Sequence, residues 1–235
     1  MSGGADRRGN IPMGNMATTV EPKTREVTTG PESGPPWYQR YQRPLLIALG
    51  VLAVAAVVTW FILASAKRKE QFAARSLNQA RAAAEAGNLP LASSELQRLI
   101  TTYKGTDAAV EAVITLNQVR MVNGQSELAA VGLREFIASK PPAKYLPPAY
   151  GLLGAAQENS KRWAEAADAY NKASSSAEIP YLKANYLVDA GRALREAGRT
   201  ADATKAYRTV IEKYSDSPSF TEAQVRLAEL TSGKM

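Results

Sequence analysis

A period of 37 residues runs through the carboxy-terminal part of this sequence. Alanine marks the period at Ala92, Ala129, Ala166 and Ala203. The positions five residues earlier hold Gly87, Gly124, Lys161 and Gly198. The positions four residues later hold Leu96, Leu133, Tyr170 and Tyr207. A fixed period in this range is typical of a solenoid, whose units bury their apolar faces only against neighbouring units, and such surfaces usually bind other proteins.

Each unit of the period predicts a pair of antiparallel helices. In the first unit, residues 73–87 are rich in strong helix formers and stop at a Gly-Asn helix C-cap signal, and residues 89–103 follow as the partner helix. Three more pairs follow, and residues 219–232 form a last helix that has no partner. We therefore expect residues 67–235 to form an all-α, right-handed solenoid of about four helix pairs and a capping helix.

Small residues are expected where the two helices of a pair cross, because a very short turn brings the helices close together. Gly154 and Gly191 hold equivalent places on the first helices of units three and four. Ala80 and Ala228 hold the same place in unit one and in the last helix. Unit two has Asn117 there. This exception predicts either a distorted unit or a hydrogen bond across the crossing.

An uncharged apolar stretch precedes the repeats. Residues 45–66 contain no Asp, Glu, Lys or Arg, and a helix of this length, rising ~1.5 Å per residue, spans about 33 Å, enough to cross a hydrocarbon core of ~30 Å. Arg40 and Arg43 precede the stretch and Lys67–Lys69 follow it. Its length and charged flanks argue against a buried core helix and predict a membrane-anchoring transmembrane helix over residues 44–66.

Two properties of this stretch leave alternatives open. Ala64, Ser65 and Ala66 fit an A-x-A cleavage pattern, so a cleaved signal peptide is the alternative to an anchor, although the apolar run exceeds the ~7–15 residues of a typical signal core. Basic residues lie on both sides, so the positive-inside rule does not settle the orientation. Arg7 and Arg8 form a twin-arginine pair, but no apolar run follows closely, which argues against a twin-arginine export signal.

The amino-terminal segment differs in composition from both of these regions. Residues 1–43 are rich in Gly, Pro, Ser and Thr and have little apolar periodicity. Such a segment buries too little surface to offset its chain entropy. We therefore expect residues 1–43 to form a disordered tail.

The composition excludes several classes of function. The chain has no cysteine and no histidine, which excludes disulfides, thiol nucleophiles and zinc sites built from these residues, and removes the commonest general base. The sequence also lacks a phosphate-binding glycine loop and a nucleophile elbow. Its net charge of +7 is spread along the chain, so nucleic-acid binding has little support. We expect no catalytic residues, no cofactor and no metal site, and hence no enzyme.

The repeat units resemble the tetratricopeptide repeat family over about residues 70–231. Units three and four match the family's pattern best, with a small residue in the first helix, a turn residue, an alanine in the second helix and a bulky residue four positions later. The residues that carry this match are Leu153, Gly154, Trp163, Ala166, Tyr170, Ala173, Leu187, Gly191, Gly198, Ala203 and Tyr207. The period exceeds the family's usual ~34 residues, and the extra residues fall between one pair and the next.

The layout of one membrane helix followed by these repeats resembles the ancillary, tetratricopeptide-bearing subunits of the bacterial Sec translocon. That resemblance implies a single-pass protein of the inner membrane, with residues 45–66 in the membrane and the repeats in the periplasm. Its partners would be translocon subunits and exported or envelope client polypeptides. The alternative is a scaffold in cell-envelope assembly or cell division, because residues 210–230 also resemble the repeat proteins of outer-membrane biogenesis.

In this architecture the first helices line the concave face, which is the expected peptide-binding surface. The residues that the repeat alignment directs inward are Leu77, Arg81, Gln118, Met121, Ala155, Glu158, Val188, Arg192 and Arg195. Arg81 and Arg192 hold equivalent places. One interpretation is that they contact carbonyl or carboxylate groups of a bound peptide. The alternative is that they form ordinary surface ion pairs, such as Arg192 with Glu196. The Lys and Asn clamp that some relatives use for a terminal carboxylate is absent. A mixed apolar and charged surface favours partly unfolded segments or an amphipathic partner.

Overall fold

The computed structural model describes residues 37–231, except for the side chains of residues 37–40 and 43. The expected disordered tail therefore lies mostly outside the described residues. Its last residues differ from the expectation, because helix α1 (Trp37–Glu85) begins at Trp37 rather than at Pro44. Residues 37–43 contain neither Gly nor Pro to stop a helix. The chain separates into two compact units, Met1–Ala55 and Ala56–Met235, so their boundary falls within α1.

Helix α1 joins the apolar stretch to the first repeat without a break. No Gly or Pro occurs between Val51 and Ala86 to end it. The large apolar side chains along the stretch are exposed, for example Leu52 at 67% and Trp60 at 68%. Helix α1 is long and apolar enough to cross a membrane, and none of its apolar window is buried by other parts of the chain. It is therefore a candidate membrane span.

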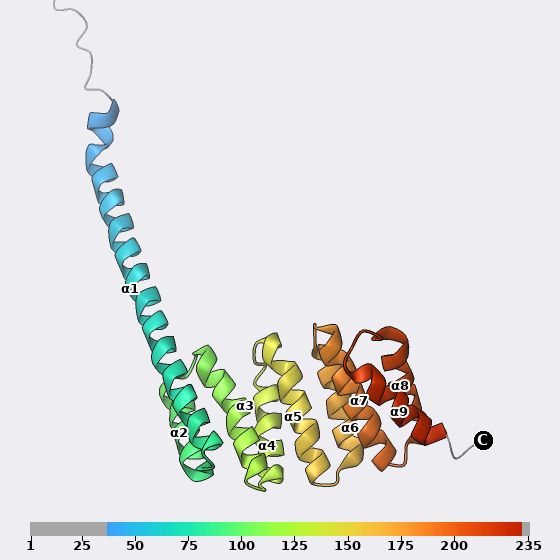
Figure 1. Cartoon of the computed structure of the whole chain (residues 1–235). Helices are drawn as coiled ribbons and strands as arrows, with labels where there is room; N and C mark the ends of the chain where they lie inside the picture. Colours follow the sequence, from blue (N-terminus) through green and yellow to red (C-terminus); the bar gives the residue numbers. More distant parts are fainter. Residues whose placement is uncertain (1–36, 232–235) are drawn as a thin grey trace, which may run out of the picture. The chain divides into compact units, whose positions relative to one another are not determined.

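The repeats are four helix pairs and a last helix (Figure 1). The carboxy-terminal part of α1 pairs with α2, and the later pairs are α3–α4, α5–α6 and α7–α8, followed by α9. The bounds are α2 Leu89–Thr102, α3 Asp107–Val122, α4 Ser126–Ala138, the short 3-10 helix η1 Ala143–Tyr145, α5 Leu146–Asn159, α6 Trp163–Ser176, α7 Pro180–Glu196, α8 Thr200–Lys213 and α9 Ser219–Thr231. The expected all-α solenoid is confirmed. We call the first helix of each pair and α9 the A helices, and the second helices the B helices.

The turn within each pair has one residue in the left-handed backbone region. Gly87, Gly124 and Gly198 have φ of 78°, 74° and 75°, and Lys161 has a φ of 59°. This conformation reverses the chain at the end of the A helix, and glycine adopts it without a steric penalty from Cβ. The glycine period seen in the sequence therefore marks the turns, and Lys161 keeps the same conformation at a cost in backbone strain.

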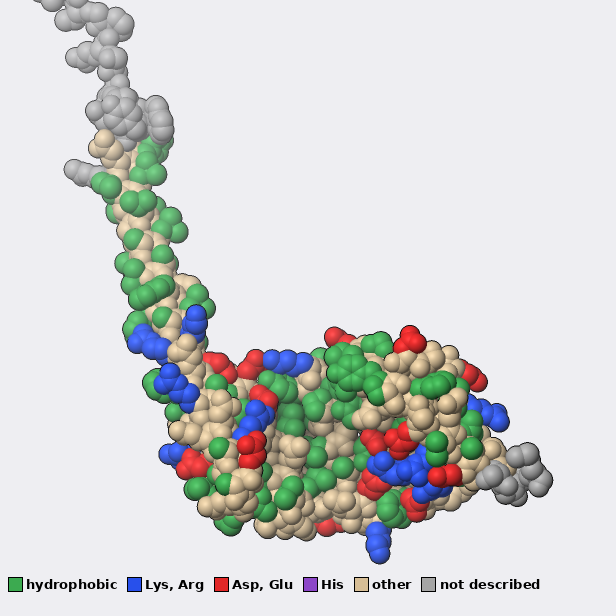
Figure 2. All heavy atoms as spheres, viewed as in Figure 1, with side chains coloured by type: hydrophobic (Ala, Val, Ile, Leu, Met, Phe, Trp, Pro, Cys, Tyr) green, Lys and Arg blue, Asp and Glu red, His purple; other side chains and the backbone are tan. Residues whose placement is uncertain are grey.

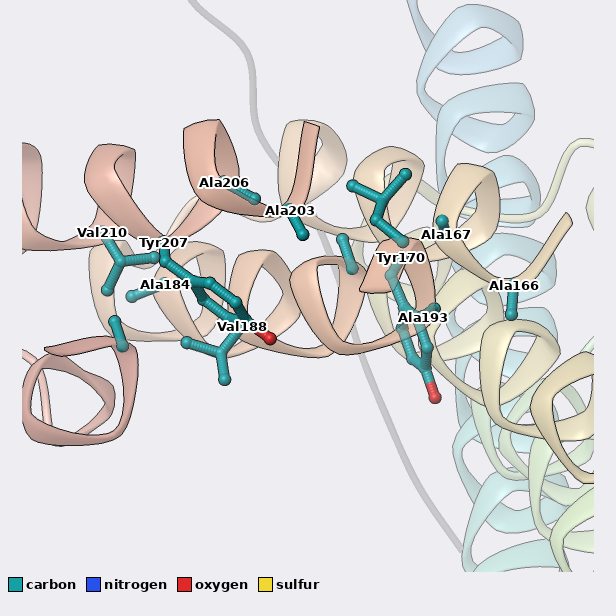
Figure 3. Packing of buried hydrophobic residues seen from close by; sticks show 13 residues of the cluster. Ala166, Ala167, Tyr170, Ala184, Val188, Ala193, Ala203, Ala206, Tyr207 and Val210 are labelled. Atoms are coloured by element: carbon teal, nitrogen blue, oxygen red, sulfur yellow. The ribbon is translucent and has the colours of Figure 1, made fainter. Parts of the chain in front are cut away.

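In units three and four a glycine on the A helix faces a tyrosine on the B helix. Figure 3 shows Tyr170 and Tyr207 among the buried apolar side chains. A Cβ atom on Gly154 would lie 2.8 Å from the ring of Tyr170, and one on Gly191 would lie 2.5 Å from the ring of Tyr207. Both tyrosines are buried, at 3% and 0% exposed. A side chain at either glycine would displace a ring that has no free space, so the expected small residues at these crossings are confirmed.

Unit two fills the same crossing in another way. Asn117 is 1% exposed, and Gly132 makes room for it, since a Cβ there would lie 2.6 Å from Asn117 Oδ1. Asn117 Nδ2 donates to the Val113 carbonyl oxygen and its Oδ1 accepts from Arg120, both on α3. The suggested hydrogen bond across the crossing is therefore wrong. Ala228 also differs from the expectation: it is exposed, because no B helix follows α9 in the described chain.

The buried apolar side chains form three clusters, and each cluster is shared between neighbouring units. One joins α1, α2 and α3, the next joins α4, α5 and α6, and the last joins α6, α7, α8 and α9. Because each unit completes the core of its neighbour, the A helices are held side by side. Their outer side chains form the surface described next.

Candidate protein-binding surface

The A helices form one face of the repeats, which we call the A-helix face. Two rows of equivalent positions line it, and their side chains are exposed or half-buried. The first row is Arg81, Gln118, Ala155 and Arg192, and the second is Ala84, Met121, Glu158 and Arg195. Most of the residues that the sequence predicted to line a peptide-binding surface therefore lie on the A-helix face.

Leu77 and Val188 do not line this face. They are 3% and 2% exposed and belong to the core clusters. Their row lies between successive A helices: a Cβ on Gly151, in the same row, would lie 2.5 Å from the ring of Tyr186 on α7. The neighbouring A helix covers this row, so the expectation that Leu77 and Val188 point toward a ligand is corrected.

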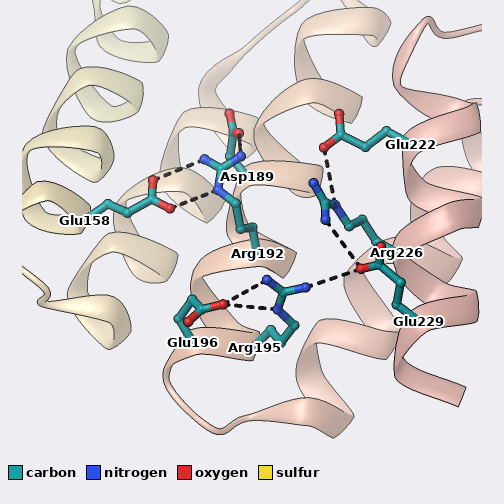
Figure 4. A network of polar contacts seen from close by, with 8 residues as sticks. All are labelled: Glu158, Asp189, Arg192, Arg195, Glu196, Glu222, Arg226 and Glu229. Atoms are coloured by element: carbon teal, nitrogen blue, oxygen red, sulfur yellow. Dashed lines mark hydrogen bonds and ion pairs between the residues drawn. The ribbon is translucent and has the colours of Figure 1, made fainter. Parts of the chain in front are cut away.

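A polar network ties α5, α6 and α7 together on this face, and Figure 4 shows its contacts between α5 and α7. Arg192 donates to Glu158 through Nε, 2.9 Å from Oε1, and through Nη2, 3.1 Å from Oε2. Arg192 Nη1 lies 2.9 Å from Oδ1 of Asp189, one turn earlier on α7. The Tyr170 hydroxyl donates to Glu158 Oε2 over 2.8 Å. Glu158 thus receives three charge-assisted hydrogen bonds from two neighbouring helices.

The network shifts the pKa values of its acids in opposite directions. Burial disfavours the charged form of Glu158, but the hydrogen bonds from Arg192 and Tyr170 outweigh burial and hold its pKa below the usual value. Burial raises the pKa of Asp189, and the nearby Arg192 offsets only part of that effect. The hydrogen bond to Glu158 raises the pKa of Arg192, which stays charged. Glu158 is therefore the anionic centre of the network.

A second group of ion pairs extends from α7 to α9 (Figure 4). Arg195 Nη2 lies 2.9 Å from Glu196 Oε1, and Arg195 Nη1 lies 3.3 Å from Glu229 Oε2. Arg226 on α9 pairs with Glu222 and Glu229 at 3.6 and 3.4 Å. The expected pairing of Arg192 with Glu196 is therefore wrong: Glu196 pairs with Arg195, while Arg192 reaches across to α5.

A groove of about 360 Å³ lies at the other end of the A-helix face, between α1 and α3. Its lining residues are Arg81, Ala84, Glu85, Leu89, Thr115, Gln118, Val119 and Val122. Arg81 donates to Glu111 over 2.6 Å beside the groove, and Val122 is 72% exposed. The groove combines apolar side chains with the exposed amide of Gln118 and a half-exposed guanidinium.

Apolar side chains lie between these two ends. Half-buried apolar residues of α3 and α5 lie beside the two rows and pack against the middle core cluster with part of their surface exposed; they include Ile114, Met121 and Leu152. Figure 2 shows apolar surface between two groups of charged side chains on the visible face. The A-helix face therefore has an apolar middle flanked by ion pairs.

The acidic partners of the arginines were missed from sequence. Glu111 and Glu229 were not singled out, and the spacing of Asp189 and Glu196 was interpreted as a solvated helix face, although Glu111, Asp189 and Glu229 each pair with an arginine of the expected surface. A sequence signal did exist for one of them, because Glu158–Arg192 and Arg195–Glu229 have opposite charges at the same separation of 34 residues. Glu111 lies 30 residues from Arg81 and follows no such rule.

The chemistry of the face is that of binding. Over residues 37–231 no group of three or more Asp or Glu side chains is placed to hold a metal ion. The carboxylates of the face accept hydrogen bonds from arginines and a tyrosine, and none of these contacts pairs a base with a nucleophile. What the face offers is apolar contact area, ion pairs and one exposed amide.

Comparison with known proteins agrees with this fold. A family model of the tetratricopeptide repeat matches residues 186–217, in α7 and α8. A crystal structure of MamA is similar at a TM-score of 0.54 and 21% identity, covering 66% of this chain and 84% of that one. The repeats of a putative kinesin light chain from Podosopora anserina, described as nearly identical and TPR-like, give a TM-score of 0.55 and 18% identity, covering 67% and 84%. No curated protein matches the sequence. At these identities the likeness shows the fold, a solenoid of tetratricopeptide type.

Proposed function

We propose that this protein is a membrane-anchored module that binds extended polypeptide segments on its A-helix face. One observation carries the proposal: an apolar middle lies between the groove at α1–α3 and the ion-pair network at α5–α9. Apolar contacts supply affinity for a polypeptide, and flanking charges set its register and orientation. The tetratricopeptide type of fold supports the same assignment.

The groove fits a segment that carries apolar side chains next to polar ones. Gln118 is exposed, and its amide both donates to peptide carbonyls and accepts from peptide N–H groups. The Arg81 guanidinium has four further N–H groups besides the one that meets Glu111. An amphipathic helix or a partly unfolded segment meets this chemistry, whereas a single acidic tail does not use the apolar residues.

We also propose where the protein acts. The exposed apolar stretch of α1 supports a single-pass anchor in the inner membrane, and we propose that the repeats lie on the periplasmic side. The clients are then newly exported or envelope polypeptides, and translocon subunits are the neighbours that deliver them. The layout of anchor and repeats supports this finer assignment.

Site-specific photocrosslinking in cells tests the binding face. A photoreactive amino acid at Gln118, in the groove, is compared with one at Gln97, an exposed residue on B helix α2. Polypeptide adducts are expected from position 118 and not from position 97. Equal adducts from both positions, or none from position 118 in a stably produced chain, would refute binding on this face. Mass spectrometry of the adducts then separates export clients and translocon subunits from envelope-assembly proteins.

Protease access to a carboxy-terminal tag tests the orientation. In spheroplasts the tag of a full-length, membrane-bound chain is expected to be digested, and in inverted vesicles it is expected to be protected. The reverse result would place the repeats in the cytoplasm. A shorter chain that begins near Lys67 would show that the apolar stretch is a cleaved signal peptide.

A further inference from the structure

The loops that connect one pair to the next share one edge of the repeats, because successive helices alternate in direction (Figure 1). We call it the loop edge; its loops are residues 103–106, 139–145, 177–179 and 214–218. Helix α1 enters the repeats at this edge. Lys69, directly after the apolar stretch, donates from Nζ to the Lys104 carbonyl oxygen over 2.8 Å. The loop edge therefore starts where the apolar stretch ends.

Hydrogen bonds at equivalent positions fix the first three units to this point of α1. The carboxylate of Glu70 accepts from the backbone N–H groups of Asp107 and Ala108, at 2.8 and 2.9 Å. Asp107 in turn pairs with Lys144 at 2.7 Å, and the Tyr145 hydroxyl donates to the Asp107 carbonyl oxygen. Glu70, Asp107 and Lys144 are spaced by the repeat period. The first residues of units one, two and three are thus joined to one another along the loop edge.

The Glu70 end of these contacts lies close to the end of the apolar stretch. Glu70 lies four positions after Ala66, a rise of about 6 Å along a helix. A bilayer is ~40–45 Å thick with its headgroups and ~30 Å without them, so each headgroup layer is about 5–8 Å deep. Residues 56–66 belong to the same compact unit as the repeats. With the apolar stretch in the hydrocarbon core, Glu70 and the Asp107 N–H group that it binds lie close to the level of the lipid headgroups.

The charges at this level are mainly positive. The exposed basic residues are Lys67, Arg68, Lys69, Lys104, Lys140 and Lys144, and Figure 2 shows basic side chains gathered where α1 meets the repeats. The acids among them are already engaged, Glu70 by two backbone N–H groups and Asp107 by Lys144. The loops farther along the edge carry the acids Glu178 and Asp216 instead. Lys213 lies beside the last of these loops, so the basic residues are concentrated on the part of the edge next to the apolar stretch but are not confined to it.

We infer that the loop edge of units one to three docks on the anionic phospholipid headgroups of the bilayer that holds α1. Lys67–Lys69, Lys104 and Lys140 contact phosphate groups, as basic residues next to a membrane span do. Docking holds the repeats against the membrane surface and fixes the direction in which the A-helix face opens. The inference rests on the membrane anchoring proposed above.

Fluorescence quenching in vesicles tests this docking. Because the chain has no cysteine, one introduced cysteine gives one labelled site in the full-length protein. The exposed Ala143→Cys places a fluorophore on the loop edge, and the exposed Asn123→Cys places one in a turn at the opposite edge. The protein is reconstituted in phosphatidylcholine vesicles with or without phosphatidylglycerol, and a headgroup nitroxide lipid is the quencher. Quenching is expected at position 143 in the anionic vesicles and not at position 123.

Two charge reversals form a matched pair. Lys140 and Lys161 are both exposed lysines in the left-handed region, with φ of 55° and 59°, and they lie at opposite edges. Lys140→Glu, combined with Ala143→Cys, is expected to lower the ratio of docked to undocked protein at least about fivefold. Lys161→Glu in the same background is expected to leave that ratio unchanged. Raising the salt concentration reduces docking of the unmodified edge.

The outcomes separate this inference from the anchor on which it rests. A chain that does not float with the vesicles refutes membrane anchoring itself. A chain that floats but shows no quenching at position 143, or equal quenching at positions 143 and 123, keeps the anchor and overturns docking of the loop edge. An equal loss of docking in Lys140→Glu and Lys161→Glu also overturns the inference, because the attraction to anionic lipid would then not depend on which edge carries the lysine.

Discussion

The first two units and the last two fill the same helix crossing with different pairs of residues. Unit one has Ala80 and Leu96, both fully buried, and unit two has Asn117 and Leu133. Units three and four have a glycine opposite a tyrosine ring. The two solutions exchange volume between the helices: a larger residue on the A helix goes with a smaller one on the B helix. The period therefore conserves the space at the crossing rather than the residue on either side.

Units three and four also differ from each other in polarity. The Tyr170 hydroxyl donates to Glu158, whereas over the described residues the buried Tyr207 hydroxyl oxygen has no hydrogen-bond partner. The position equivalent to Glu158 in unit four is Arg195, which only donates. The charge at this position is inverted from unit three to unit four, so the tyrosine hydroxyl has a hydrogen-bond partner in unit three and none among the described residues in unit four.

The largest expected effect is at the tightest crossing. Gly191→Ala adds a Cβ atom that would lie 2.5 Å from the buried Tyr207 ring. The substitution is expected to lower the free energy of unfolding by about 3 kcal/mol. Ala80→Gly, the reverse change in unit one, is expected to cost only about 1 kcal/mol. Denaturant unfolding followed by circular dichroism measures both. Adding Tyr207→Leu to Gly191→Ala copies unit one and should recover part of the loss; no recovery would contradict the exchange of volume.

The next effect is at the anionic centre. Glu158→Gln removes charge-assisted hydrogen bonds from Arg192 and Tyr170, and is expected to cost about 2 kcal/mol at pH 7. Since the folded-state pKa of Glu158 is lowered, its contribution is present above the unfolded value of about 4.3 and is lost as the pH falls through the folded value. The gap between wild type and Glu158→Gln should therefore shrink in acid.

Asp189 is the matched control for this pH dependence. Its pKa is raised by burial, so the folded state binds a proton more readily than the unfolded state. The stability of the wild type relative to Asp189→Asn should therefore increase as the pH falls toward the unfolded value of about 3.9. The same sign of pH dependence for both variants would show that the network does not shift the pKa values of Glu158 and Asp189 in opposite directions.

The two tyrosines give a smaller and more selective test. Tyr170→Phe removes the donor to Glu158 and is expected to cost about 1 kcal/mol. Tyr207→Phe removes a buried hydroxyl without a partner among the described residues, and is expected to change stability by about 0 kcal/mol or to raise it slightly. Thermal melts of the two variants measure this difference. Equal losses of stability in the two variants would mean that the Tyr207 hydroxyl contributes as much to folding as the Tyr170 hydroxyl does.

The smallest effect is in the turns. Lys161 has a left-handed φ, and glycine occupies the equivalent position in the other three units. Lys161→Gly is therefore expected to raise the free energy of unfolding by about 0.5 kcal/mol. Gly198→Ala, where nothing lies within 4 Å of the added Cβ, isolates the backbone strain and is expected to cost about 1 kcal/mol. A loss of stability in Lys161→Gly would indicate that this lysine side chain stabilises its turn.

The sequence predicted the helices better than it predicted the surface. Turn residues and crossings are local features, so Gly87, Gly198 and Gly154 revealed their roles through spacing alone. The surface assignments failed where burial depends on a neighbouring unit, because Leu77 and Val188 are covered by the next A helix. The partner of Arg192 was also misjudged, because the nearest charge in sequence, Glu196, was preferred to Glu158 on another helix.

The sequence by itself determined the period, the helix pairs, the turns and the apolar stretch, because each is encoded by residues within one unit or one helix. Only the tertiary structure decided which arginine meets which carboxylate, how Asn117 is accommodated by Gly132, and that Glu70, Asp107 and Lys144 lie along one edge. The contacts between helices among them join residues about 15 to 38 positions apart. Side-chain direction and the stacking of units set them, and neither property can be read from residue type alone.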